Sequence, residues 1–135
     1  MVEGLKEILM RKRDMKKILQ SIRFALRGLR HAYVSDKSFR MEVNYGLPIY
    51  TILGGLLFPF QSWEIVLYVF SYIIILVVEL INTAFEKMLD RLHPEQHESI
   101  ERSKDMAAAA VLMTFVFAAF IVGILIYGRI CESVL

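Results

Sequence analysis

Three polar side chains, Glu79, Asn82 and Glu86, lie where a long apolar segment of the chain ends. On an α-helix, with 100° between residues, Glu79, Glu86 and Asp90 fall within about 40° of one another, and Asn82 lies on the adjoining stripe. Ionised carboxylates stacked in this way repel one another unless a cation binds, and carboxylate oxygen suits hard divalent ions such as Mg²⁺. The spacing therefore predicts a metal-binding carboxylate site at the end of a helix.

The segments around these residues are typical of a membrane protein. The chain has 135 residues, of which 56% are hydrophobic, and its mean hydropathy is +0.49. Three stretches are apolar and long enough to cross a bilayer, at about 43–60, 63–80 and 106–127. Gln61 and Ser62 are expected to form a tight turn between the first two spans. Glu79 lies just inside the second span with no basic residue within one turn in sequence, which favours a functional role.

Basic residues are distributed unevenly along the chain. Of the 16 Lys and Arg residues, 11 lie among the first 42, and four more lie in the loop 86–105. By the positive-inside rule, the N-terminus and this loop face the cytoplasm and the C-terminus lies outside. Because membrane-like sequence follows the basic segment, its expected partner is a lipid surface and not a nucleic acid. The single Cys131 excludes an internal disulfide and a CxxC-type metal site.

An amphipathic helix is predicted before the first span, over residues 16–33. Apolar residues recur at helical spacing there, while Arg23, Arg27 and Arg30 share another face, as in a helix that lies on a membrane surface. Lys and Arg interrupt the first apolar stretch, so we expect no cleaved secretory signal. The predicted fold is an all-α membrane protein, with a basic extension 1–15 and one domain 16–135.

Two segments resemble a known family. The stretch ELINTAFEKMLDRLHPEQHESIERSKDMAAAAV, which begins at Glu79, resembles the signature of the bacterial diacylglycerol kinase and undecaprenol kinase family. That signature has the form ExxN[ST]AIExxxD, followed by an acid, a histidine and KD before a run of small residues. The stretch ALRGLRHAYVSDKSFRMEVN is similar to the family's surface helix and its link into the first span, and the resemblance extends over about residues 17–127.

The resemblance implies a homotrimer of three-span subunits in the bacterial cytoplasmic (inner) membrane. Its reaction is transfer of the ATP γ-phosphoryl group to a lipid primary hydroxyl with Mg²⁺, at sites on the cytoplasmic side. Glu79 would be the general base, and Asp36 and Glu86 would be the metal ligands. The implied ATP-binding residues are Lys17, Phe24, Asp36, Glu86, Glu95, Gln96, His97, Lys104 and Asp105. The implied lipid-binding residues are Arg30, His31, Ala32, Tyr33, Ser38, Phe39, Arg40, Met41, Glu42 and Glu79, with Asn82 and Asp90 in support.

Three positions depart from the family's pattern. Asp36 stands where the family usually has Glu, Phe85 replaces an Ile, and Phe24 stands where a Tyr is often found. Diacylglycerol is favoured as the acceptor by the DR that follows the catalytic helix and by the FRME stretch, and undecaprenol is the alternative. Two readings from other classes stay open: an ion or proton conductor with Glu79 as a relay, and a structural oligomerisation subunit.

Overall fold

The computed structural model is helical throughout the part of the chain that it describes. It describes residues 2–93, 95 and 97–134, and for residues 2–10, 12, 133 and 134 it describes the backbone alone. The helices are α1 (Val2–Ser35), α2 (Lys37–Met41), the π-helical turn η1 (Glu42–Gly46), α3 (Leu47–Leu57), α4 (Ser62–Leu92) and α5 (Glu98–Val134). No strand occurs among these residues, in agreement with the all-α prediction.

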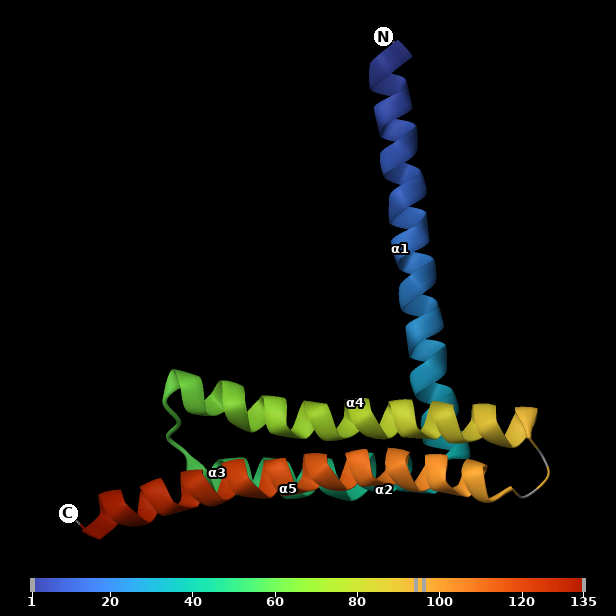
Figure 1. The fold of residues 1–135 in the computed structure, drawn as a ribbon. Helices are drawn as coiled ribbons and strands as arrows, with labels where there is room; N and C mark the ends of the chain where they lie inside the picture. Colours follow the sequence, from blue (N-terminus) through green and yellow to red (C-terminus); the bar gives the residue numbers. More distant parts are fainter. Residues whose placement is uncertain (1, 94, 96, 135) are drawn as a thin grey trace.

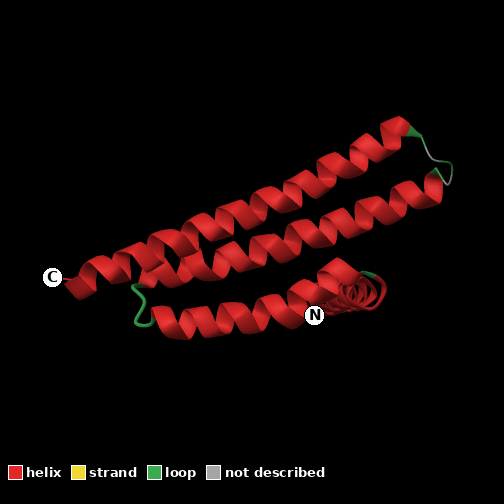
Figure 2. Ribbon diagram, turned by 90° about the horizontal axis from the view of Figure 1, so that it is seen from below, coloured by secondary structure: helices red, strands yellow, loops and turns green. Residues whose placement is uncertain are grey.

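Helices α4 and α5 are both long and apolar enough to cross a membrane. They lie side by side along most of their length, and Figures 1 and 2 show α3 beside them. Helix α4 continues well beyond Leu80 to Leu92, which confirms that the predicted carboxylate stripe lies on one helix. Helix α5 begins at Glu98, two turns before the predicted span 106–127, because its polar first turns are also helical.

The segment of the first predicted span is a helix in three parts. Helices α2, η1 and α3 follow one another without a break from residue 37 to residue 57, since the residues at each junction keep right-handed helical backbone angles. This helix is about 32 Å long at 1.5 Å per residue. It begins before the predicted residue 43 and ends before residue 60, because Phe58 is extended and Pro59 follows it. Each part alone is too short to span a bilayer.

The link between α3 and α4 differs from the predicted two-residue turn. It comprises residues 58–61, and Ser62 is already the first residue of α4. Gln61 and Glu64 form a capping box at this helix start, and Arg129 from α5 donates to the carbonyls of Leu57 and Pro59 at 3.0 and 2.6 Å. Arg129 also pairs with Glu64 at 2.6 Å. Glu64 is buried, with 6% of its surface exposed.

Helix α1 runs across the direction of the bundle and projects from it (Figure 1). It is one continuous helix, which contains the predicted helix 16–33 and extends back through the basic segment before it. Contacts near its C-terminal end hold it in place: Tyr33 donates to Asn44 at 2.9 Å, and Lys87 donates to Ser35. Residues 13–31 of α1 are exposed and include many apolar side chains, as in a helix that rests on a membrane surface.

Candidate active site

Asp36 lies between α1 and α2 and is the N-cap of α2. Its backbone is extended, and its Oδ1 accepts a 2.8 Å hydrogen bond from the backbone N–H of Phe39. Asp is one of the side chains preferred at an N-cap. The second carboxylate oxygen, Oδ2, forms no hydrogen bond with any residue that the structure describes. The shorter acid at this position thus has a local structural role as well as a free oxygen.

Glu79 is the most deeply buried acid of the predicted stripe. It is only 3% exposed, and it has no hydrogen bond or ion pair with any described residue. Repulsion acts on its charge from Asp36 and Glu86, and Glu79 and Asp36 in turn repel the charge of Glu42. We call these four residues the acidic group. Its members come from the link between α1 and α2, from η1 and from α4. Asp36 and Glu86 are 50 positions apart in the sequence, so the fold brings together distant side chains.

The polar atoms of the acidic group are only partly satisfied. Asn82 donates from Nδ2 to Glu86 Oε1 at 3.1 Å, which orients that carboxylate. Oε2 of Glu42 and Oδ1 of Asn82 are buried without a hydrogen-bond partner. Buried polar atoms normally have partners, so orphaned oxygens beside uncompensated acids indicate that a cation or a donor ligand belongs here.

The acidic group has the chemistry of a magnesium site without forming a closed protein cage. Within the described ranges, no three His, Cys, Asp or Glu side chains lie close enough together to hold a metal ion. Mg²⁺ typically takes only one or two carboxylates and completes its octahedron with substrate phosphates and water. Asp36 through its free oxygen and Glu86, oriented by Asn82, fit that pattern.

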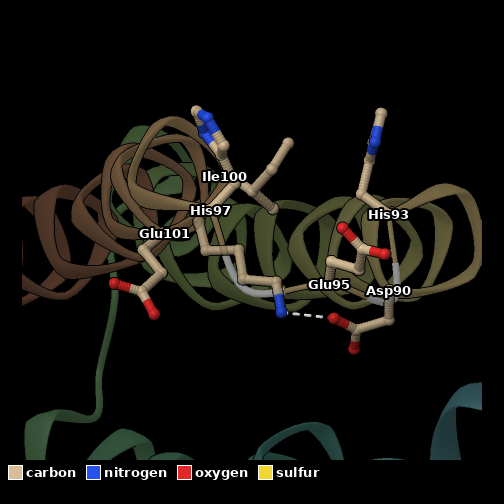
Figure 3. Close-up of a pocket in the computed structure, with 7 residues that line it drawn as sticks. Asp90, His93, Glu95, His97, Ile100 and Glu101 are labelled. Carbon is tan, nitrogen blue, oxygen red and sulfur yellow. Dashed lines mark hydrogen bonds and ion pairs between the residues drawn. The ribbon is translucent and has the colours of Figure 1, made fainter.

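A polar pocket of about 370 Å³ lies at the end of the bundle where α4 ends and α5 begins (Figure 3). It is lined by Asp90, His93, Glu95, His97, Ile100, Glu101 and Lys104. Lys104 forms an ion pair with Asp90 across the pocket, drawn as the dashed line in Figure 3. We call it the loop-end pocket. Lys104 is the amine in this lining that could contact a phosphate, whereas Asp90, Glu95 and Glu101 would repel a phosphate unless a cation lay between them.

Most of the residues predicted for the nucleotide at this end line the loop-end pocket. Glu95, His97 and Lys104 belong to it, as does Asp90, for which a supporting role was predicted. Asp105 is exposed next to Lys104 in sequence, and Gln96 lies outside the described residues. His93, Ile100 and Glu101 also line the pocket and were not among the residues predicted to bind the nucleotide. Ile100 and Glu101 could have been predicted from the sequence, because positions 97, 100, 101 and 104 fall on one face of a helix.

A second hollow, of about 510 Å³, lies between α1 and α4. It is lined by Ala25, Gly28, Leu29, His31 and Ala32 from α1 and by Leu80, Thr83, Ala84 and Lys87 from α4. We call it the α1–α4 groove. Its lining is mainly apolar, and the buried Thr83 hydroxyl in it has no hydrogen-bond partner. Two of the residues predicted to contact lipid, His31 and Ala32, lie here beside the α4 turn that follows Glu79.

Other predicted residues are not gathered into these sites. Lys17 and Phe24 lie on the projecting part of α1, outside the loop-end pocket, and the Phe24 ring instead faces the Arg27 guanidinium at 5.6 Å. Arg40 donates to the carbonyls of Tyr33 and Val34 at 3.3 and 3.1 Å, which satisfies the end of α1. The remaining members of the predicted lipid set are the buried Phe39 and the exposed Arg30, Ser38 and Met41.

Comparison with known proteins gives consistent matches over most of the chain. The family model described as prokaryotic diacylglycerol kinase matches residues 23–127. The chain is 31% identical over 113 residues to the diacylglycerol kinase of Escherichia coli (strain K12), covering 84% of this chain and 91% of that protein. It is 28% identical over 109 residues to the diacylglycerol kinase of Haemophilus influenzae, covering 78% and 88% of the two chains. It is 29% identical over 111 residues to that of Helicobacter pylori (strain J99), covering 82% and 85%.

Proposed function

The chain belongs to the prokaryotic diacylglycerol kinase family and is a lipid kinase, and we propose that it transfers the γ-phosphoryl group of ATP to the primary hydroxyl of diacylglycerol. The product is phosphatidic acid, and undecaprenol is the alternative acceptor. The observation that carries the proposal is Glu79, a buried acid without a partner among the described residues, near enough to Asp36 and Glu86 for their charges to act on it.

Glu79 is the proposed general base. Its carboxylate takes the proton of the lipid hydroxyl as the hydroxyl oxygen attacks the γ-phosphorus, and the bond from that phosphorus to the bridging oxygen breaks to release ADP. A carboxylate that already has a hydrogen-bond donor would be a weaker acceptor for this proton. Glu79 has no such donor within the described part of the chain, so its lone pairs remain available for the lipid hydroxyl.

Asp36 and Glu86 are the proposed ligands of Mg²⁺. When bound, Mg²⁺ would neutralise negative charge on the transferring phosphate groups. The hydrogen bond from Asn82 holds Glu86 for that role, and the capping bond of Asp36 leaves its second oxygen for it. The repulsion between these acids supports a bound cation, since a cation relieves it.

The loop-end pocket is the proposed site for the nucleotide. Lys104 supplies the positive charge that the ATP phosphates require, and His97 and Glu95 offer polar contacts beside it. The partly exposed Asp90–Lys104 pair can be exchanged for a phosphate–Lys104 pair, because ion pairs near the surface contribute little stability. Gln96 and Asp105, which are also proposed to contact the nucleotide, are sequence neighbours of residues that line this pocket.

The α1–α4 groove is the proposed place for the lipid's apolar part. Its apolar lining suits acyl chains, and Leu80 and Thr83 belong to the same helical stretch as Glu79. A diacylglycerol in the groove would then have its hydroxyl at the depth of the acidic group. Lys17, Phe24 and Arg30 remain candidates for contacts in an assembled homotrimer, where a neighbouring subunit would approach α1.

The chain is a membrane protein, and we further propose three spans, with the segment 37–57 as the first and helices α4 and α5 as the others. The proposed location is the bacterial inner membrane, with the N-terminus and the active site in the cytoplasm. The basic content of the first 42 residues and of the loop 86–105 supports this orientation.

The test is phosphorylation by the purified protein in nanodiscs with ATP and Mg²⁺, with diacylglycerol or undecaprenol as the acceptor. We expect Glu79→Gln to lower kcat by at least about a hundredfold while ATP binding stays within a factor of two, because only the base is lost. Glu98→Gln is the matched control, since Glu98 lies on the α5 surface in an exposed pair with Arg102. Near-normal turnover by Glu79→Gln would refute the assignment, and faster turnover of undecaprenol would change the acceptor.

A further inference from the structure

The helix of the first proposed span contains one turn of π-helix, η1, between α2 and α3. The N–H of Leu47 donates to the carbonyl of Glu42, five residues back, where an α-helix would use four. Pro48 gives a reason for the wider turn. It has no N–H to donate, and in regular α geometry its ring would crowd the carbonyl of Asn44.

The extra residue in the turn changes the direction in which Glu42 points. A single inserted residue rotates everything before it by about 100° relative to the helix after it. Helix α3 is fixed by its packing, since Tyr50, Leu53 and Leu57 contact the core of the bundle. With α3 held there, a regular α-helix would turn the Glu42 side chain by that same angle, out of the acidic group.

Tyr72 of α4 contacts both ends of this turn. Its hydroxyl donates to the Glu42 carbonyl at 3.0 Å, so that this oxygen accepts two hydrogen bonds, one from Leu47 and one from Tyr72. At the other end its ring packs against Gly46, where a Cβ atom would lie 3.2 Å from Tyr72 Cε2. The ring of Tyr50 fixes the Tyr72 ring from a third side, with the centroids 4.7 Å apart.

Tyr72 is nevertheless remote from the reacting groups. It precedes Glu79 by seven residues on α4, which is roughly 10 Å along the helix axis. Its effect on the acidic group therefore passes through the turn, whose first residue, Glu42, has a buried, unpartnered carboxylate oxygen and feels the charges of Glu79 and Asp36.

We propose that Tyr72 is a positioning residue: its hydroxyl stabilises the π turn, and the turn directs the Glu42 carboxylate into the acidic group beside Glu79. The structural half of this inference is independent of the activity. The catalytic half rests on the proposed function, in which Glu42 lies on the lipid side of the site, and it assigns Tyr72 an effect on the lipid and none on the nucleotide.

The test compares Tyr72→Phe with the wild type by amide hydrogen exchange and by kinetics. Losing one neutral hydrogen bond should speed exchange in a peptide spanning 42–47 by about three- to tenfold and lower kcat/KM for the lipid by a similar factor. The KM for ATP should stay unchanged. Tyr45→Phe is the control, because Tyr45 lies in the same turn, is 67% exposed and forms no hydrogen bond with a described residue.

A double-mutant cycle separates action through Glu42 from a general loss of stability. In a Glu42→Gln background, Tyr72→Phe should cause little further loss of kcat/KM, because the group that it positions is already gone. Unchanged exchange rates in Tyr72→Phe would overturn the inference whether or not the protein is active. Faster exchange with unchanged lipid kinetics, or full additivity in the cycle, would overturn its catalytic half. A wild-type protein without kinase activity would instead refute the proposed function, and the exchange rates would still decide whether Tyr72 holds the turn.

Discussion

Asp36 combines two roles that substitutions can separate. One carboxylate oxygen caps α2 through the 2.8 Å bond from Phe39 N–H, and the other is the proposed metal ligand. Asp36→Asn keeps an acceptor for the cap and removes the charge. Asp36→Glu keeps the charge but moves it one methylene further from the backbone, where it caps poorly. Asp36→Ala removes both.

The magnitudes follow from these bonds. Loss of an N-cap costs about 1 kcal/mol, which is a few degrees in Tm for a chain of this size. We therefore expect Asp36→Ala and Asp36→Glu to lower the Tm by a few degrees, and Asp36→Asn to leave it unchanged or higher, since it also relieves repulsion on Glu79. Loss of a metal ligand should raise the Mg²⁺ concentration needed for half-maximal activity by at least about tenfold in Asp36→Asn. Asp36→Glu should stay much closer to the wild type in this respect.

The assays are thermal unfolding in detergent without Mg²⁺ and a Mg²⁺ titration of turnover in nanodiscs. If Asp36→Asn kept a normal Mg²⁺ dependence, Asp36 would be a cap alone and the metal assignment would be refuted. If Asp36→Asn lost as much Tm as Asp36→Ala, the reasoning about the cap would be wrong.

Two further predictions concern the two ends of the bundle. Lys104→Met should raise the KM for ATP at least tenfold and leave the KM for the lipid within a factor of two, because a phosphate contact is lost in the loop-end pocket. An unchanged KM for ATP in steady-state kinetics would exclude Lys104 from the nucleotide site. Arg129→Ala should lower the Tm by clearly more than Arg102→Ala. The reason is that Arg129→Ala leaves the buried Glu64 without its cation, whereas Arg102 is 72% exposed. Equal Tm values in thermal unfolding would show that the Arg129–Glu64 pair does not stabilise the α3–α4 link.

The carboxylate stripe on α4 could be predicted because one helix fixes it. The angles between Glu79, Glu86 and Asp90 depend only on helical geometry, and the helix does continue past Leu80. The apolar pattern likewise indicated α4 and α5 as candidate spans. It did not indicate that α5 begins at Glu98, because the first turns of that helix are polar.

The partners of that stripe could not be read from the residues alone. Asp36 entered through the family resemblance, because no local pattern relates a residue before one helix to a stripe on another. The π turn was not anticipated either: Pro48 is visible in the sequence, but its consequence depends on the Tyr72 hydroxyl, 24 positions later, meeting the Glu42 carbonyl. Contacts of this kind arise from packing, which periodicity does not describe.

The pairing of Glu64 with Arg129 has a consequence for how the protein is made. The two residues are 65 positions apart, and the cation lies on α5, which leaves the ribosome after α3 and α4. During translation the hairpin of α3 and α4 exists for a time with an unpaired acid at its turn. An unpaired acid is costly to bury, so that turn has to stay hydrated until α5 arrives. We therefore expect closure of this end to be a late step of biogenesis, in which the docking of α5 is coupled to the final burial of the α3–α4 turn.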